Sequence, residues 1–177
     1  MATEKERGLA LVFTGNGKGK TTAALGTVLR AAGYGQKIYI VFFLKGKRDS
    51  GEFVTLSKLP GVVVSRFGLR AFADPKNVKP EEKIQARKAF SAARKAVMSG
   101  EYQLVVMDEI NVAVSYNLVN PNEVIELIKE KPPHVDLILT GRYADNRVLE
   151  AADLVTEMVN VKHPFEKGIK ARKGIEY

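Results

Sequence analysis

Short apolar runs alternate with amphipathic stretches along the whole of this 177-residue chain. The runs are mostly continuous and rich in β-branched residues, which is typical of strands that are buried on both faces of a sheet. Strands are therefore predicted at residues 9–13, 37–44, 62–67, 104–107, 135–140 and 154–161.

The amphipathic stretches between these runs predict helices. The longest, 81–98, carries small and apolar residues at helical spacing. Further helices are expected at 21–32, 51–59, 121–131 and 145–152. Strands that alternate with helices through short connections imply right-handed crossovers and a mainly parallel sheet covered on both faces. The predicted fold class is α/β with three layers, in one domain over residues 1–177.

A glycine-rich segment, TGNGKGKTT at residues 14–22, lies between the first strand and the first helix. This context predicts a phosphate site, because the glycines let successive N–H groups point at one anion and the helix adds its positive dipole end. Lys20 would add a mobile charge, and Thr21 stands where a hydroxyl ligates Mg²⁺. The residues expected to hold phosphates are Gly15, Asn16, Gly17, Lys18, Gly19, Lys20, Thr21 and Thr22.

The domain is thus predicted to be P-loop NTPase-like, with one departure from the usual spacing. In G-x-x-x-x-G-K-[ST] the first position is glycine, but here that position is Thr14 and the first glycine is Gly15. The loop is effectively one residue short, which could hold a polyphosphate in a different register.

Two other predicted strands end in charged residues. Asp108 and Glu109 follow strand 104–107, where acidic groups can hold Mg²⁺ directly or through water. Arg142 follows strand 135–140. In a parallel sheet it would face the phosphates, and a plain surface charge is the equal alternative.

Composition narrows the class of protein. A formal charge of +8 suggests anionic partners, but the basic residues are spread along the chain, which disfavours nucleic acid. The absence of cysteine excludes thiolate chemistry and fits a cytoplasmic protein. No apolar run approaches the roughly 18 residues of a membrane span. The basic tail 162–177 is expected to be solvated, although His163-Pro164-Phe165 could anchor part of it.

Six segments of the sequence indicate a more specific function than these patterns do. They are TGNGKGKTTAALGTVLRAAGYG at 14–35, FLKG at 43–46, VVMDEI at 105–110, LTGR at 139–142, ADLVTEM at 152–158 and KHPFEKGIKARKGIEY at 162–177. Together they closely resemble the P-loop family of ATP:corrinoid adenosyltransferases. The resemblance implies that ATP lies reversed, so that the loop holds the triphosphate as a leaving group. Cobalt of cob(I)alamin would attack the ribose C5′, giving adenosylcobalamin and tripolyphosphate.

The resemblance also implies roles for individual residues. Lys20 would neutralise phosphate charge, and Arg142 would contact the polyphosphate. Thr21 and Glu109 would hold Mg²⁺, and Asp108 would support these two ligands from the next layer of residues. It further implies an electron-donating reductase as partner, and family members are often homodimers.

The corrinoid half of the site departs from the family. Segment 68–79 has no helical or strand period, so it is either a binding lid or a surface excursion. The family usually carries Phe-x-Trp there, whereas this chain has no Trp, and its nearest match is Phe72-Ala73-Asp74. We expect Phe72 to supply the apolar wall against the corrinoid, with Phe67 as the second choice.

Two other functions use the same residues. An ordinary P-loop ATPase or phosphotransferase, acting at the γ-phosphate, needs the same loop and the same acids. A nucleotide-dependent nucleic-acid-binding module is supported only by the net charge.

Overall fold

The structure, a computed structural model, describes residues 7–46, 50–69 and 78–175. Within these ranges six strands form one sheet in the order β3-β2-β4-β5-β1-β6, and all neighbouring strands are parallel. The strands are β1 (Ala10–Thr14), β2 (Ile38–Phe42), β3 (Val62–Arg66), β4 (Leu104–Asp108), β5 (Asp136–Thr140) and β6 (Leu154–Glu157). The predicted α/β class with a parallel central sheet is confirmed.

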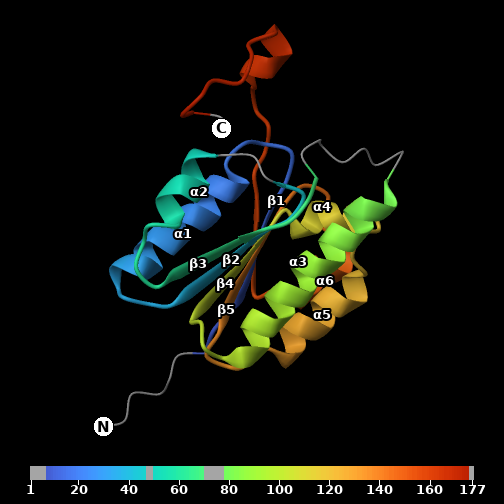
Figure 1. The fold of residues 1–177 in the computed structure, drawn as a ribbon. Helices are drawn as coiled ribbons and strands as arrows, with labels where there is room; N and C mark the ends of the chain where they lie inside the picture. The colour runs from blue at the N-terminus through green and yellow to red at the C-terminus, as the bar shows by residue number, and fades with distance from the viewer. Residues whose placement is uncertain (1–6, 47–49, 70–77, 176–177) are drawn as a thin grey trace.

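Helices cover both faces of the sheet (Figure 1). Helices α1 and α2 lie on one face, and α3, α4, α5 and α6 lie on the other. The described helices are α1 (Lys20–Gly33), α2 (Gly51–Leu56), α3 (Pro80–Ser99), α4 (Ile110–Ser115), α5 (Pro121–Glu130), α6 (Asn146–Ala151) and the 3₁₀ turn η1 (Pro164–Lys167). In the described part of the chain, no helix is both long and apolar enough to cross a membrane.

Each face has its own hydrophobic core. Val28 of α1 packs with Ile40 and Val106 on one face, and Phe90 of α3 packs with Met107 on the other. Because the central strands contribute to both cores, they must be apolar at successive positions. The predicted stripe of α3 is buried as expected, at Ala86, Ala89, Phe90, Ala93, Ala96 and Val97.

Local signals set the helix ends. The side chains of Ser50, Asn120 and Asp145 accept hydrogen bonds from backbone N–H groups at the starts of α2, α5 and α6. Gly100 ends α3 in the left-handed conformation, at φ 66°. Ser, Asn and Asp at helix starts and Gly at a helix end are the residue types that these positions favour.

The structure adds one helix to the predicted elements and corrects two predictions. Helix α4 was not predicted, because its segment INVAVS is short and rich in β-branched valine. The last strand stops at Glu157, not at residue 161, because the chain then turns toward the glycine-rich loop, where the N–H of Gly17 donates to the carbonyl of Met158. Phe165 does not anchor the tail, since it is 77% exposed.

Candidate nucleotide-binding site

The candidate site lies where three adjacent strands end. Thr14, Asp108 and Thr140 are the last residues of β1, β4 and β5, and all three are buried. These strands are neighbours in the sheet and parallel, so their carboxyl ends meet at one edge. The edge therefore gathers polar groups from distant parts of the sequence beside the start of α1.

The loop between β1 and α1 is closed by the side chain of Lys20. Its ammonium donates hydrogen bonds to the carbonyl oxygens of Gly15 at 2.8 Å and Gly17 at 2.6 Å. Burial, followed by repulsion from Arg142, lowers the pKa of Lys20, while the carboxylates of Glu109 and Asp108 oppose that shift. The loop thus curls around a positive charge.

The chain after β6 supports this loop from outside. The N–H of Gly17 donates to the carbonyl of Met158 at 2.6 Å. A Cβ on Gly15 would lie 2.5 Å from the Met158 oxygen, and one on Gly17 would lie 2.6 Å from the Val159 oxygen. Glycine is needed at both positions because two backbones approach closely there.

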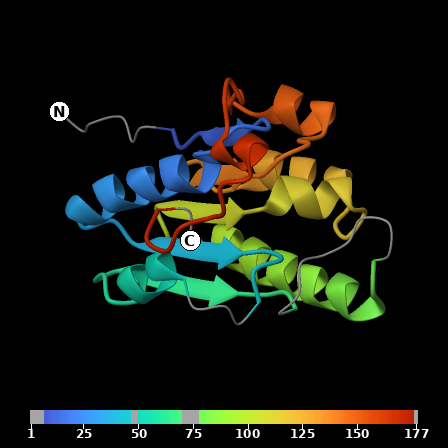
Figure 2. The same ribbon diagram turned by 90° about the horizontal axis from the view of Figure 1, so that it is seen from above.

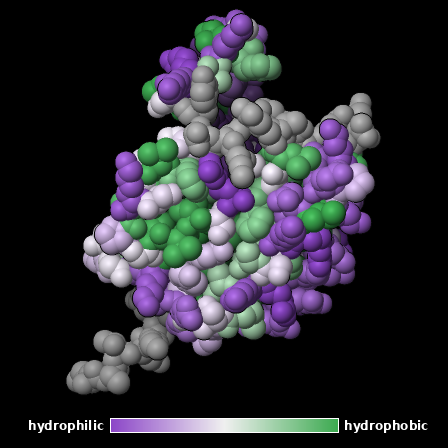
Figure 3. All heavy atoms as spheres, viewed as in Figure 1, coloured by the Kyte–Doolittle hydropathy of each residue, from purple (hydrophilic) through white to green (hydrophobic). Residues whose placement is uncertain are grey.

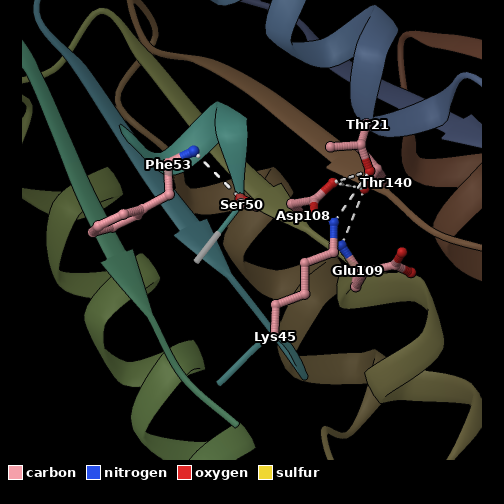
Figure 4. A network of polar contacts seen from close by, with 7 residues as sticks. All are labelled: Thr21, Lys45, Ser50, Phe53, Asp108, Glu109 and Thr140. Carbon is pink, nitrogen blue, oxygen red and sulfur yellow. Dashed lines mark hydrogen bonds and ion pairs between the residues drawn. The ribbon is translucent and has the colours of Figure 1, made fainter. Parts of the chain in front are cut away.

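A buried carboxylate organises the polar side chains of the site (Figure 4). Asp108 is 1% exposed. Its Oδ1 accepts hydrogen bonds from the hydroxyls of Thr21 at 2.9 Å and Thr140 at 2.7 Å, and its Oδ2 accepts one from the ammonium of Lys45 at 2.6 Å. Both oxygens are therefore satisfied, and the carboxylate fixes the orientation of Thr21.

The turn after β2 aims Lys45 at this carboxylate. Leu44 adopts a left-handed conformation, at φ 57°, and the N–H of Lys45 donates to the carbonyl of Phe67. A Cβ on Gly46 would lie 2.5 Å from the carbonyl oxygens of Gly68 and Leu69. Burial by itself lowers the pKa of Lys45, but attraction to Asp108 and Glu109, with the Asp108 hydrogen bond, outweighs it and raises the pKa.

Glu109 holds an unusual backbone conformation at the start of α4. Its φ of 65° is left-handed, which is rare outside glycine and is frequent at functional sites. Its N–H donates to the Thr140 hydroxyl at 3.0 Å. Burial, and then repulsion from Asp108, raises the pKa of Glu109, while Lys45, Lys20 and Arg142 oppose the shift.

The remaining predicted residues lie around this centre. Arg142 follows the end of β5 and is exposed, so it lies at the same edge, and its charge contributes to the lowered pKa of Lys20 and opposes the raised pKa of Glu109. Phe67 follows β3, partly buried against the core on the α3 side. Phe72 lies outside the described residues.

On the glycine-rich loop and the first turn of α1, the residues Asn16, Lys18 and Thr22 are exposed.

Two residues of the network, Lys45 and Thr140, have no motif or spacing in the sequence that predicts a role for them. Nothing in the local pattern around either residue marks it, since Lys45 opens a polar loop and Thr140 ends an apolar strand. Both lie in segments that carry the family resemblance, FLKG and LTGR, and that was the available signal.

Comparisons with known proteins agree with this arrangement. The family model described as ATP:corrinoid adenosyltransferase BtuR/CobO/CobP matches residues 6–177. A corrinoid adenosyltransferase of Sinorhizobium sp is 38% identical over 180 residues, which span 100% of this chain and 84% of that protein. The corrinoid adenosyltransferase of Escherichia coli strain K12 is 37% identical over 174 residues, 98% of this chain and 88% of that protein. The chain therefore belongs to the ATP:corrinoid adenosyltransferase family.

Proposed function

We propose that this protein transfers the 5′-deoxyadenosyl group of ATP to the cobalt of a reduced corrinoid and releases tripolyphosphate. One observation carries the proposal. The loop is one residue short and is fixed against Met158 and Val159, in a chain that belongs to this family over nearly its whole length. A loop whose task is to hold a leaving triphosphate needs a fixed register and no positioned water.

Mg²⁺ fits the oxygen atoms at the strand ends. This cation takes oxygen ligands and usually retains waters or substrate phosphate oxygens beside one or two protein ligands. Both oxygens of Asp108 already accept short hydrogen bonds. The hydroxyl oxygen of Thr21 accepts a longer one, from the Lys45 ammonium at 3.4 Å, and Glu109 borders the same edge. We therefore assign Thr21 and Glu109 as ligands and Asp108 as the residue that orients Thr21. Bound there, the cation would offset the charge of the phosphates.

The side chains of the protein need not attack the substrate, because the reduced cobalt is itself the nucleophile. The loop N–H groups, Lys20 and Arg142 would stabilise charge on the leaving phosphates. The protein would also align cobalt with C5′, and alignment alone is worth about 7–11 kcal/mol in favourable cases. The network around Asp108 holds the phosphate side of this alignment rigid.

We propose that Phe72 forms an apolar wall against the corrinoid, with Phe67 as the alternative. We also propose that a separate reductase supplies the electron, that the protein acts in the cytoplasm, and that it forms a homodimer.

An anaerobic assay tests the function. Purified protein is given ATP, Mg²⁺ and chemically reduced cob(I)alamin, and adenosylcobalamin is followed by its absorption spectrum. We expect transfer by the parent protein and none by Lys20→Ala, with Lys95→Ala on the exposed face of α3 as the matched control. Transfer at the parental rate by a folded Lys20→Ala variant would contradict the assignment of the loop.

A further inference from the structure

After β6 the chain leaves the sheet and then returns to the glycine-rich loop. The carbonyl of Met158 accepts a hydrogen bond from the N–H of Gly17, and the carbonyl of Ile175 accepts one from the ammonium of Lys18 at 3.1 Å. Residues 159–175, which we name the strap, therefore begin and end beside consecutive residues of the loop. Figure 1 shows the strap projecting beyond the carboxyl end of the sheet, and Figure 2, seen from above, shows it in front of the strands.

The strap is strongly basic. It carries five basic residues and one acidic residue, a net charge of +4 that is half of the charge of the whole chain. Glu166 is the acidic residue, and its carboxylate accepts a hydrogen bond from Asn160 inside the strap at 2.8 Å. The basic residues, all exposed, are Lys162, Lys167, Lys170, Arg172 and Lys173.

Burial does not hold the strap in place. Val159, Val161 and Phe165 are 70%, 91% and 77% exposed, and Figure 3 shows apolar and charged residues mixed on the projecting part. Between its pinned ends, the hydrogen bonds described for it are local, such as that from the N–H of Phe165 to Nδ1 of His163. A segment with so little packing has a low cost of local rearrangement.

We propose that the strap is a second phosphate-binding element, which folds onto the triphosphate of bound ATP and retains the tripolyphosphate product. The inference rests on the proposed function, since that function places the triphosphate in the loop to which both ends of the strap are attached. On the protein side of the triphosphate, Lys20 belongs to the loop. Arg142, which follows β5, lies nearby. The strap supplies cations from the solvent side, and ammonium or guanidinium groups make strong charge-assisted hydrogen bonds with phosphate.

Binding of tripolyphosphate tests the strap directly. The variant Lys167→Gln/Lys170→Gln/Lys173→Gln removes three positive charges without touching the loop. We expect it to bind inorganic tripolyphosphate about tenfold or more weakly in calorimetry, because several charge-assisted contacts are lost together. The matched control is Lys83→Gln/Lys88→Gln/Lys95→Gln, which removes the same charge from exposed positions of α3. Equal affinity of the two variants would overturn the inference.

Limited digestion with trypsin gives a second readout, because the basic residues of the strap are cleavage sites. We expect ATP with Mg²⁺, or tripolyphosphate with Mg²⁺, to protect these sites, and adenosine not to. Absence of protection by tripolyphosphate would overturn the inference. Protection that depends on protein concentration and not on ligand would overturn it as well, because a second copy would then cover the strap. Failure of the proposed function is distinct, since the parent protein would then form no adenosylcobalamin.

Discussion

Replacing Lys45 by Met removes the charge that faces the buried Asp108 and keeps most of the length of the side chain. The ammonium lies 2.6 Å from Oδ2 of Asp108, whose side chain is 1% exposed, while the Lys45 side chain is 40% exposed. Removing one partner of a fully buried pair costs about 3–5 kcal/mol, and a surface pair is worth about 0–1 kcal/mol.

The cost of breaking the pair between Lys45 and Asp108 should lie between these two limits. Asp108 keeps two hydroxyl donors, Thr21 and Thr140, so its carboxylate is not left without partners. We therefore expect Lys45→Met to lower the free energy of unfolding by about 2 kcal/mol, a change of about 30-fold in the unfolding equilibrium constant. Loss of the contact between the ammonium and the Phe42 ring, 5.3 Å from its centroid, is part of this total.

The assay is urea unfolding in metal-free buffer, with Lys95→Met as the matched control. The control is expected to change stability by less than about 0.5 kcal/mol, because its side chain is exposed. Asp108→Asn and the double variant complete a thermodynamic cycle. A coupling energy of at least about 1 kcal/mol supports the account, and additivity within about 0.5 kcal/mol would refute it.

Further predictions concern the acid, the loop and the lid. Folding raises the pKa of the Glu109 carboxyl, so the unfolded chain releases the carboxyl proton at lower pH than the folded protein does. The parent protein therefore loses stability as the pH rises from about 4.3, the pKa of an unperturbed Glu, through the pKa of the folded state. Glu109→Gln has no titrating carboxyl at this position, so it does not lose stability in this way. In buffer with a metal chelator, the free energy of unfolding of Glu109→Gln minus that of the parent should therefore increase with pH. A difference that stays constant from pH 4 to 8 would contradict this. Gly17→Ala should destabilise by about 1–3 kcal/mol and weaken tripolyphosphate binding, because the new methyl group would meet the Val159 carbonyl. Gly26→Ala, with no atom within 4 Å, should stabilise α1 by about 0.5–1 kcal/mol in the same unfolding assay. Phe72→Ala should slow adenosylation from cob(II)alamin plus reductant far more than from preformed cob(I)alamin, and equal losses in the two rates would refute a specific role.

Much of the fold could be predicted, because its signals are local. The apolar runs of β2, β4 and β5 are continuous, and the caps Asn120 and Asp145 lie directly before their helices. Helix α4 lacks such a signal. It begins after Glu109, whose left-handed conformation no local residue preference predicts and whose N–H donates to the hydroxyl of Thr140, far away in the sequence.

The residues of the site could be predicted where they belong to a local sequence motif. They could not be predicted where residues that are distant in the sequence come into contact only in the folded structure. The glycine-rich loop directly follows β1, and Asp108 and Glu109 lie at the carboxyl end of β4, so the sequence alone marks them as candidates. Lys45 meets Asp108 across 63 positions of sequence, through a turn that depends on Gly46 lying against Gly68. The attachment of Ile175 to Lys18 spans 157 positions, and a basic tail in the sequence predicts only solvation.

The phosphate product of turnover tests the central claim most directly. The protein is incubated anaerobically with ATP, Mg²⁺ and cob(I)alamin, and phosphorus NMR identifies the products while absorption measures adenosylcobalamin. Adenosyl transfer breaks the bond between C5′ and the triphosphate, so the account predicts one intact tripolyphosphate for each adenosylcobalamin and essentially no ADP. ADP that accumulates in step with turnover would contradict the account and would indicate attack at the γ-phosphate.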